Sequence, residues 1–268
     1  MSPPFLAVSI ERDLCRLSGA DYHRWMSPNV SVHMLPALMP EGCLEGSVAV
    51  IIDILRASTT IVHALAHGAT SVIPCALVEE ARTAASQYER GHILLGGERS
   101  GQLIEGFDLD NSPLAYTPEV VSGRTIAFTT TNGTRALRAC EQAGRVLIGA
   151  FVNKSALLRV LQEDGRPVHL VCAGTDGHLT AEDILFAGAI AAELNPQSPD
   201  VQTQMAIDYD RSHSKDDQTF RETIRTSRGG QNLLRLGLDA DVARASESDL
   251  FGIVPEWSRE TNMITIKN

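Results

Sequence analysis

The chain has 268 residues, of which 43% are hydrophobic and 21% are charged. A chain of this length and composition can bury a substantial core, either as one large domain or as two small ones. Its formal net charge of -10 argues against a general nucleic-acid surface, because phosphate backbones are bound by clustered lysine and arginine. No apolar run approaches the roughly 18 to 20 residues of a membrane span, and no signal-peptide pattern opens the chain. We therefore expect a cytoplasmic protein with no nucleic-acid and no membrane partner.

Residues 1–45 carry scattered prolines and no firm period. We interpret them as an N-terminal extension with one strand near Val30 to Met34. Residues 46–268 are interpreted as the main unit, with proposed subdomains at 46–150 and 151–268.

Strands alternate with helices along the main unit. The run from Val48 to Ile52 is apolar and β-branched, as in strands buried on both faces of a parallel sheet, and helical spacing follows from Ser58 to His67. The same order recurs after the runs 71–73, 93–95, 125–128, 146–148 and 168–171. This alternation predicts an α/β fold with a mostly parallel or mixed sheet and flanking helices, built as two α/β subdomains in one compact unit. Asp216 to Leu236 has helical spacing, but Gly229-Gly230 weakens it, so the segment is read as one helix or two.

The cysteines and histidines give no metal motif. The five cysteines show neither CxxC nor Cys/His spacing, so reduced thiols are expected. Cys172 follows an apolar run, which favours a buried small hydrophobic residue over a nucleophile. The eight histidines are dispersed without HxH or HExxH, so most are expected at the surface and no zinc site is predicted.

Four polar clusters follow expected strands, where ligands of parallel sheets gather. They are Asp53, Arg56 and Ser58; Glu98, Arg99, Glu105 and Asp108; Thr129 to Asn132 with Gly133 and Thr134; and Gly174 and Thr175 with Glu182 and Asp183. Each has a simpler interpretation. Asp53 could only end a strand, with Ser58 capping the next helix, and Thr180 with Asp183 resembles a capping box. Thr129 to Thr131 could be a β-branched strand end, although Asn-Gly-Thr before a helix presents backbone amides suited to an anion.

Taken together, the clusters indicate a site for a hard metal and an anion. Magnesium binds through carboxylates, waters and phosphate oxygens, and Asp53, Glu98, Glu105 and Asp108 supply such carboxylates. Arg56 and Arg99 can pair with phosphate, sulfonate or carboxylate oxygens in a bidentate manner. The hydroxyls and amides from Thr130 to Thr134 would complete the anion site. There is neither GxxxxGK[ST] nor GxGxxG, so an NTPase or dinucleotide fold is not favoured.

Four ordered segments resemble the 2-phosphosulfolactate phosphatase (ComB) family. They are VIIDILRASTT, LGGERSGQLIEGFDLDNSP, TTTNGTRA and AGTDGHLTAED, and the resemblance runs from about Val48 to Pro255, including SRGGQNLLRLGL and DLFGIVP. The resemblance implies an α/β protein that depends on Mg²⁺. It also implies hydrolysis of (2R)-phospho-3-sulfolactate to sulfolactate and phosphate, a step in coenzyme M biosynthesis. The first motif has Ala57-Ser58-Thr59-Thr60 where the family commonly shows A-T-S-T or A-T-S-V.

The positions that match the family pattern define the candidate site. We assign catalytic roles to Asp53, Arg56, Arg99 and Asp183, and magnesium ligation to Asp53, Glu98, Glu105 and Asp108. Substrate binding is assigned to Arg56, Ser58, Arg99, Asn111, Thr130, Asn132, Gly133, Thr134, Gly174 and Thr175.

The predicted function is a magnesium-dependent phosphoric monoester hydrolase acting on a small anionic organophosphate. The nucleophile is left open between water, which is preferred, and the carboxylate of Asp53. The alternatives are a phosphatase for another small phosphorylated hydroxy acid and a non-catalytic module that binds an organophosphate or sulfonate. The oligomeric state is left open, with a homodimer as one option.

Overall fold

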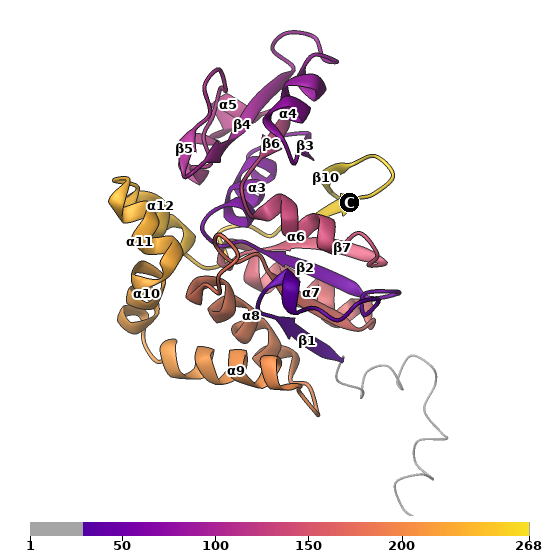
Figure 1. Ribbon diagram of the computed structural model, residues 1–268, viewed down its shortest axis with the longest axis vertical. Helices are drawn as coiled ribbons and strands as arrows, with labels where there is room; N and C mark the ends of the chain where they lie inside the picture. The colour runs from indigo at the N-terminus through magenta and orange to yellow at the C-terminus, as the bar shows by residue number, and fades with distance from the viewer. Residues whose placement is uncertain (1–28, 268) are drawn as a thin grey trace, which may run out of the picture.

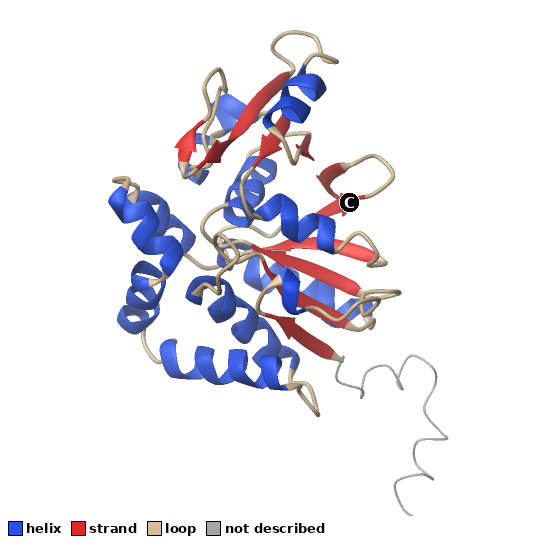
Figure 2. Ribbon diagram, viewed as in Figure 1, coloured by secondary structure: helices blue, strands red, loops and turns tan. Residues whose placement is uncertain are grey.

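A computed structural model describes residues 29–267. Within this range one ten-stranded mixed sheet runs through the molecule in the order β1-β8-β2-β7-β9-β10-β3-β6-β4-β5, and helices flank it (Figures 1 and 2). The predicted α/β class is confirmed. The strands are β1 (Val30–His33), β2 (Val48–Ile52), β3 (Ser71–Pro74), β4 (Ile93–Arg99), β5 (Gln102–Leu103), β6 (Thr125–Thr129), β7 (Arg145–Gly149), β8 (Val168–Cys172), β9 (Pro255–Ser258) and β10 (Met263–Ile266).

The first half of the sheet is parallel and consists of β1, β8, β2 and β7. All five residues of β2 are buried, and Val48 lies opposite both Arg145 of β7 and Val168 of β8. A central strand of this kind is covered on both faces, which explains its unbroken apolar sequence. The strand expected near Val30 to Met34 is confirmed as β1, and Cys172 at the end of β8 is fully buried as predicted.

The second half of the sheet contains the parallel strands β3, β6 and β4, and the short antiparallel β5 extends it. The hairpin of β9 and β10 joins the halves, because β9 pairs antiparallel with β7 and β10 pairs antiparallel with β3. Strands from 151–268 are therefore inserted among the earlier strands of the chain: β8 lies between β1 and β2, and the β9–β10 hairpin lies between β7 and β3. The division into subdomains at residue 150 stays a prediction.

Helices cover both parallel halves and extend away from the sheet at one side. They are α3 (Ala57–Ala66), α4 (Val78–Ala85), α5 (Pro118–Val121), α6 (Gly133–Ala139), α7 (Lys154–Asp164), α8 (Ala181–Leu194), α9 (Val201–His213), α10 (Asp217–Thr226), α11 (Arg228–Arg235) and α12 (Asp239–Ala245), with the 3-10 helices η1 (Pro36–Leu38), η2 (Pro113–Ala115) and η3 (Phe151–Asn153). None of the helices in the described part of the chain has the length and apolar content to cross a membrane.

The segment from Asp216 to Leu236 forms two helices rather than one. Ser227 separates α10 from α11, and its Oγ accepts a hydrogen bond of 3.0 Å from the amide of Gly230. A Cβ at Gly230 would lie 2.3 Å from the carbonyl oxygen of Ile224. Gly230 thus permits the close approach of α11 to the end of α10, whereas a Cβ at Gly229 would lie 2.0 Å from Glu182 Oε1.

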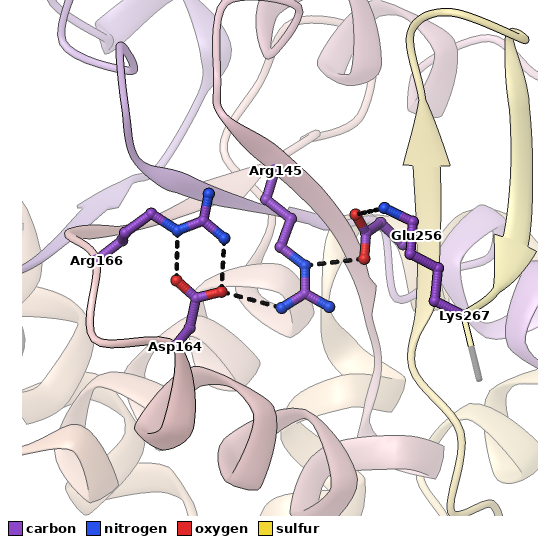
Figure 3. Close-up of polar contacts among 5 residues, drawn as sticks. All are labelled: Arg145, Asp164, Arg166, Glu256 and Lys267. Carbon is purple, nitrogen blue, oxygen red and sulfur yellow. Dashed lines mark hydrogen bonds and ion pairs between the residues drawn. The ribbon is translucent and has the colours of Figure 1, made fainter.

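An ion network fixes the C-terminal hairpin at the start of β7 (Figure 3). Arg145 donates hydrogen bonds of 2.8 Å to Glu256 of β9 and 2.9 Å to Asp164 at the end of α7. Arg166 donates two further bonds to Asp164, and Lys267 pairs with Glu256. Both carboxylates are only 5% exposed, so their charges are compensated almost entirely by these partners.

Candidate active site

A cavity of about 380 Å³ opens at the carboxyl ends of β2, β4, β6 and β8. The two parallel halves of the sheet contribute loops to it, and α11 closes one side. The position agrees with the general rule for ligands of parallel sheets. Its lining residues are Asp53, Leu55, Arg56, Glu98, Ser100, Gly101, Asn111, Thr130, Thr131, Asn132, Thr175, Asp176, Gly229, Asn232, Leu233, Arg235 and Leu236.

Asp53 is the first residue after β2 and is held rigidly. Its amide donates a hydrogen bond of 3.0 Å to Ser58 Oγ, and its Oδ1 accepts one of 3.2 Å from the amide of Ala57. Burial raises the pKa of Asp53 to about 7, the amide of Ala57 opposes this, and the charges of Glu98 and Glu182 add to it. Ser58 itself is buried and also donates to Ile51 O at 3.2 Å, so it supports Asp53 from behind.

The loop after β6 borders the carboxylate of Asp53. Thr130 and Asn132 line the cavity, and Asn132 Oδ1 accepts a hydrogen bond of 3.2 Å from the amide of Asp176 across it. A Cβ at Gly133 would lie 3.2 Å from Asp53 Oδ2 and 2.9 Å from the Cβ of Ala57, so glycine permits this close approach. Thr134, the next residue, does not line the cavity. Its hydroxyl Oγ1 donates a hydrogen bond of 3.2 Å to Cys75 O.

Glu98 brings a second buried carboxylate to the cavity from β4. Its Oε2 accepts a hydrogen bond of 2.7 Å from the amide of Gly101, and its Oε1 accepts one of 2.9 Å from the amide of Thr131. The side chain is 7% exposed, as is that of Asp53. Glu98 therefore links the β4–β5 turn to the loop after β6 while its carboxylate borders the cavity.

Three residues of the acidic segment lie outside the lining. Arg99 donates to Glu98 O, Ala76 O and Thr129 Oγ1 at 2.7, 3.2 and 2.8 Å, which ties β4 to its neighbours. Asp108 Oδ2 accepts a hydrogen bond of 2.8 Å from the amide of Leu95, and both Asp108 and Glu105 are exposed. The structure thus does not bring these assigned residues together with Asp53 and Glu98.

The packing of the loop explains this placement. Ile104 and Phe107 are buried in a small second core with Cys75, Ala81 and Ala127. Since these two side chains face inward, Glu105 and Asp108 face solvent on the outer surface of β4. Burial of Ile104 and Phe107 holds the loop in place, while Glu105 and Asp108 point away from the cavity.

Arg56 lies in the cavity wall with both terminal nitrogens engaged. Nη1 donates a hydrogen bond of 2.6 Å to Asp241 of α12, and Nη2 donates one of 3.0 Å to Gly101 O. The other oxygen of Asp241 accepts a bond of 2.6 Å from Ser112 Oγ. Sequence reasoning missed Asp241, because its only local context is one more acid in a charged helical segment.

Asp183 lies beneath the cavity floor rather than on its surface. Its two oxygens accept hydrogen bonds from the amides of Ile54 at 2.9 Å and Gly174 at 3.0 Å, joining the loops after β2 and β8. Burial raises its pKa well above the usual aspartate value, and the charges of Glu182 and Asp53 raise it further. The capping-box prediction is wrong, because the side chain of Thr180 makes no capping bond and Asp183 turns to these other amides.

Glycine at position 174 has a steric reason. Its φ is +67°, and a Cβ would lie 2.5 Å from His178 O. Thr175 follows it into the cavity lining, and its amide donates 3.0 Å to the same carbonyl. Gly174 and Thr175 thus form a tight turn at the cavity edge.

Several buried oxygens at the site lack hydrogen-bond partners among residues 29–267. They are Asn111 Oδ1, Thr131 Oγ1 and Glu182 Oε2. Asn111 and Thr131 line the cavity beside Asp53 and Glu98. This all-oxygen donor set fits magnesium, which is usually bound by one or two carboxylates and retained waters. The sequence places Glu182 in one of the four polar clusters but assigns it no role. Asn232 and Arg235 of the cavity wall were not predicted as site residues, although they lie in the SRGGQNLLRLGL segment.

The family model for 2-phosphosulpholactate phosphatase matches residues 33–260. The chain belongs to this family. The resemblance seen in the four motifs is thereby confirmed, and so is the prediction of a phosphoric monoester hydrolase.

Relatives from three bacteria are similar over most of their length. A protein of Symbiobacterium thermophilum is 42% identical over 80% of this chain and 93% of its own. A protein of Caldanaerobacter subterraneus is 40% identical over 77% of this chain and 86% of its own length. A protein of Synechococcus is 40% identical over 84% of this chain and 95% of its own length. Each of the three is named a probable 2-phosphosulfolactate phosphatase.

Proposed function

We propose that this protein is a magnesium-dependent phosphatase that hydrolyses (2R)-phospho-3-sulfolactate to 3-sulfolactate and phosphate. Membership of the family and the names of the relatives support the substrate. The proposal includes a role in coenzyme M biosynthesis and a cytoplasmic location. A homodimer is one option for the assembly.

One structural observation carries the proposal. Asp53 and Glu98, from opposite halves of the sheet, are buried carboxylates that border the same cavity as the guanidinium of Arg56. Both residues are only 7% exposed. Keeping two such carboxylates charged costs free energy without a cation, because burial and mutual repulsion disfavour their charged forms. A divalent ion held by these two carboxylates would compensate their charges.

The residues that would hold magnesium are Asp53 and Glu98, with Asn111 Oδ1 as a neutral oxygen donor. The ion would supply Lewis-acid polarisation of the phosphoryl oxygens. Arg56 would stabilise the charge that develops on those oxygens with its remaining N–H groups. Thr130, Thr131 and Thr175 would bind the oxygens of the substrate from the cavity wall.

Water remains the preferred nucleophile. Asp53 Oδ1 already accepts from Ala57, and Oδ2 faces Gly133 so closely that one added carbon would lie 3.2 Å away. In this proposal Asp53 would orient an attacking water in the cavity rather than attack the phosphorus itself.

Release of phosphate from a panel of phosphorylated hydroxy acids tests the proposed function. We expect (2R)-phospho-3-sulfolactate to have the highest kcat/KM, and activity to require Mg²⁺ and to stop with excess EDTA. A higher kcat/KM for an analogue without the sulfonate would favour the phosphatase of another hydroxy acid. Binding of these compounds without turnover would favour the non-catalytic module, and full activity in EDTA would remove the role of the metal.

A further inference from the structure

A second cluster of ligand-type side chains lies at the outer edge of the sheet, away from the cavity. β1 is the edge strand and β8 is its neighbour. His33 ends β1, and His169 lies opposite Ser31, two residues earlier on the same strand. Because alternate residues of a strand share a face, both imidazoles project from the same face of the sheet. Their rings are stacked with centroids 5.1 Å apart, and His33 Nε2 and His169 Nδ1 are 2.8 Å apart.

Cys43 joins the two histidines from the turn that follows η1. One ligand atom from each of His33, Cys43 and His169 lies within 4.8 Å of the others, the only such group of three or more among residues 29–267. Both histidines are buried, whereas Cys43 is half-buried, which gives an ion access from solvent. The three residues span 136 positions of sequence, so no short spacing motif could have revealed them.

The imidazole of His33 is incompletely satisfied where it stands. Its Nε2 shares a hydrogen bond with His169, but its buried Nδ1 has no partner within the described chain. Either tautomer of His33 therefore leaves one buried polar group unpaired, which is costly. A buried polar atom without a partner in a cluster of ligand-type residues indicates a bound species.

The protonation states of the two imidazoles suit a metal. Burial lowers the pKa of His33 to about 4, the neighbouring His169 lowers it further, and the carboxylate of Asp200 opposes both. The pKa of His169 is lowered as well, chiefly by burial. Both imidazoles are therefore neutral at pH 7, and each keeps a lone pair for an ion. Burial raises the pKa of the Cys43 thiol, so its thiolate would form as an ion binds, whereas the two imidazoles are already in the ligating form.

We propose that His33, Cys43 and His169 bind one transition-metal ion of the zinc class, separate from the magnesium of the cavity. Two imidazoles and one thiolate are ligands that zinc prefers, whereas magnesium prefers oxygen. One ligand atom of each residue already lies within 4.8 Å of the others, so small side-chain movements suffice to place the three around one ion. With three protein ligands, the fourth position goes to water. The ion would fix edge strand β1 and the turn at Cys43 to β8.

Cobalt(II) titration of the full-length protein in excess Mg²⁺ tests the site. We expect one Co²⁺ per chain with a near-ultraviolet thiolate-to-cobalt charge-transfer band, which the oxygen donors of the cavity cannot produce. Cys43→Ser should abolish the band, His169→Gln should weaken Co²⁺ binding at least tenfold, and the exposed control His92→Gln should leave both unchanged. The proposal is overturned if the wild-type protein shows no such band, or if Cys43→Ser keeps it.

A thermal measurement gives an independent result. Zn²⁺ should raise the Tm of the wild-type protein and of His92→Gln by several degrees, because a ligand that binds only the folded state stabilises it. The same Zn²⁺ should not raise the Tm of Cys43→Ser, whose magnesium-supported phosphate release without Zn²⁺ should match wild type and so report correct folding. An equal Tm increase in Cys43→Ser and wild type would contradict the proposed ligands.

Discussion

Arg56 Nη1 lies 2.6 Å from Asp241 Oδ2, and the two residues are 185 positions apart in the chain. Their side chains are 2% and 3% exposed. The pair joins the loop after β2 to α12, beside the helix that closes the cavity. Because Arg56 also donates to Gly101 O, its guanidinium fixes three segments around the candidate site.

This pair gives the first prediction. Asp241→Asn removes the charge that compensates a buried guanidinium, and breaking a buried pair in this way costs about 3 to 5 kcal/mol. We expect a clear fall in Tm together with a lower kcat/KM, since Arg56 loses its orientation. Thermal unfolding and steady-state kinetics on the same preparation measure both.

Arg56→Lys separates charge from geometry at the same position. Lysine keeps the charge but lacks the planar guanidinium, whose several N–H groups can contact Asp241, Gly101 O and a phosphoryl oxygen at the same time. A loss of about 1.5 to 3 kcal/mol in transition-state stabilisation, roughly 10- to 150-fold in kcat/KM, is expected. Wild-type kcat/KM in Arg56→Lys would show that the guanidinium geometry is not used.

The second prediction compares two acids of one segment. Glu98→Gln removes a charge that borders the cavity, so kcat should fall by orders of magnitude while the hydrogen bond to Gly101 or Thr131 partly persists. Asp108→Asn is the matched control, because its side chain binds the amide of Leu95 on the outer surface. We expect near wild-type kcat for the control. Equal losses in both variants would argue that the segment rearranges when substrate binds.

The sequence predicted the parts of this fold that depend on local pattern. Val48 to Ile52 is recognisable as a buried strand because every one of its residues is apolar, and Asp53 is placed by that strand's end. The ends of parallel strands meet at one edge, so Thr130 and Thr175 could be expected beside Asp53.

Contacts between distant segments could not be predicted in this way. The partner of Arg56 is set by how α12 packs, which no local spacing encodes. Similarly, Asp108 and Glu98 look alike in sequence, and only the burial of Phe107 determines which of them faces out. The expectation of surface histidines is wrong for His33, His63 and His169, all three of which are buried.

The third prediction concerns pH and the network in Figure 3. Hydrogen bonds from Arg166, and then from Arg145, hold the pKa of Asp164 below its usual value. A depressed folded-state pKa stabilises the fold above the unfolded pKa, about 3.9, and this contribution is lost as the pH falls through the folded value. Asp164→Asn should therefore unfold more easily than wild type at pH 7. The difference should shrink below about pH 4, and a difference independent of pH would contradict the role of the charge.

The fourth prediction separates the two nucleophiles. A substrate with a chiral [¹⁶O,¹⁸O]thiophosphoryl group is hydrolysed in ¹⁷O-water, and the configuration of the released thiophosphate is determined. Direct attack by water is one displacement at phosphorus and inverts the configuration. Transfer to Asp53 followed by attack of water on the aspartyl-phosphate is two displacements and retains it. We expect inversion, and retention would assign the attack to Asp53.

The most direct test of the central claim is magnesium-supported hydrolysis of (2R)-phospho-3-sulfolactate by Asp53→Asn beside wild type. Asparagine keeps the shape and can keep the hydrogen bond from Ala57, so the fold should persist, as circular dichroism and Tm would report. We expect phosphate release to fall by at least a thousandfold at saturating Mg²⁺, with the Asp108→Asn control near wild type. Phosphate release within a few-fold of wild type in folded Asp53→Asn would contradict the assignment of this cavity as the phosphatase site.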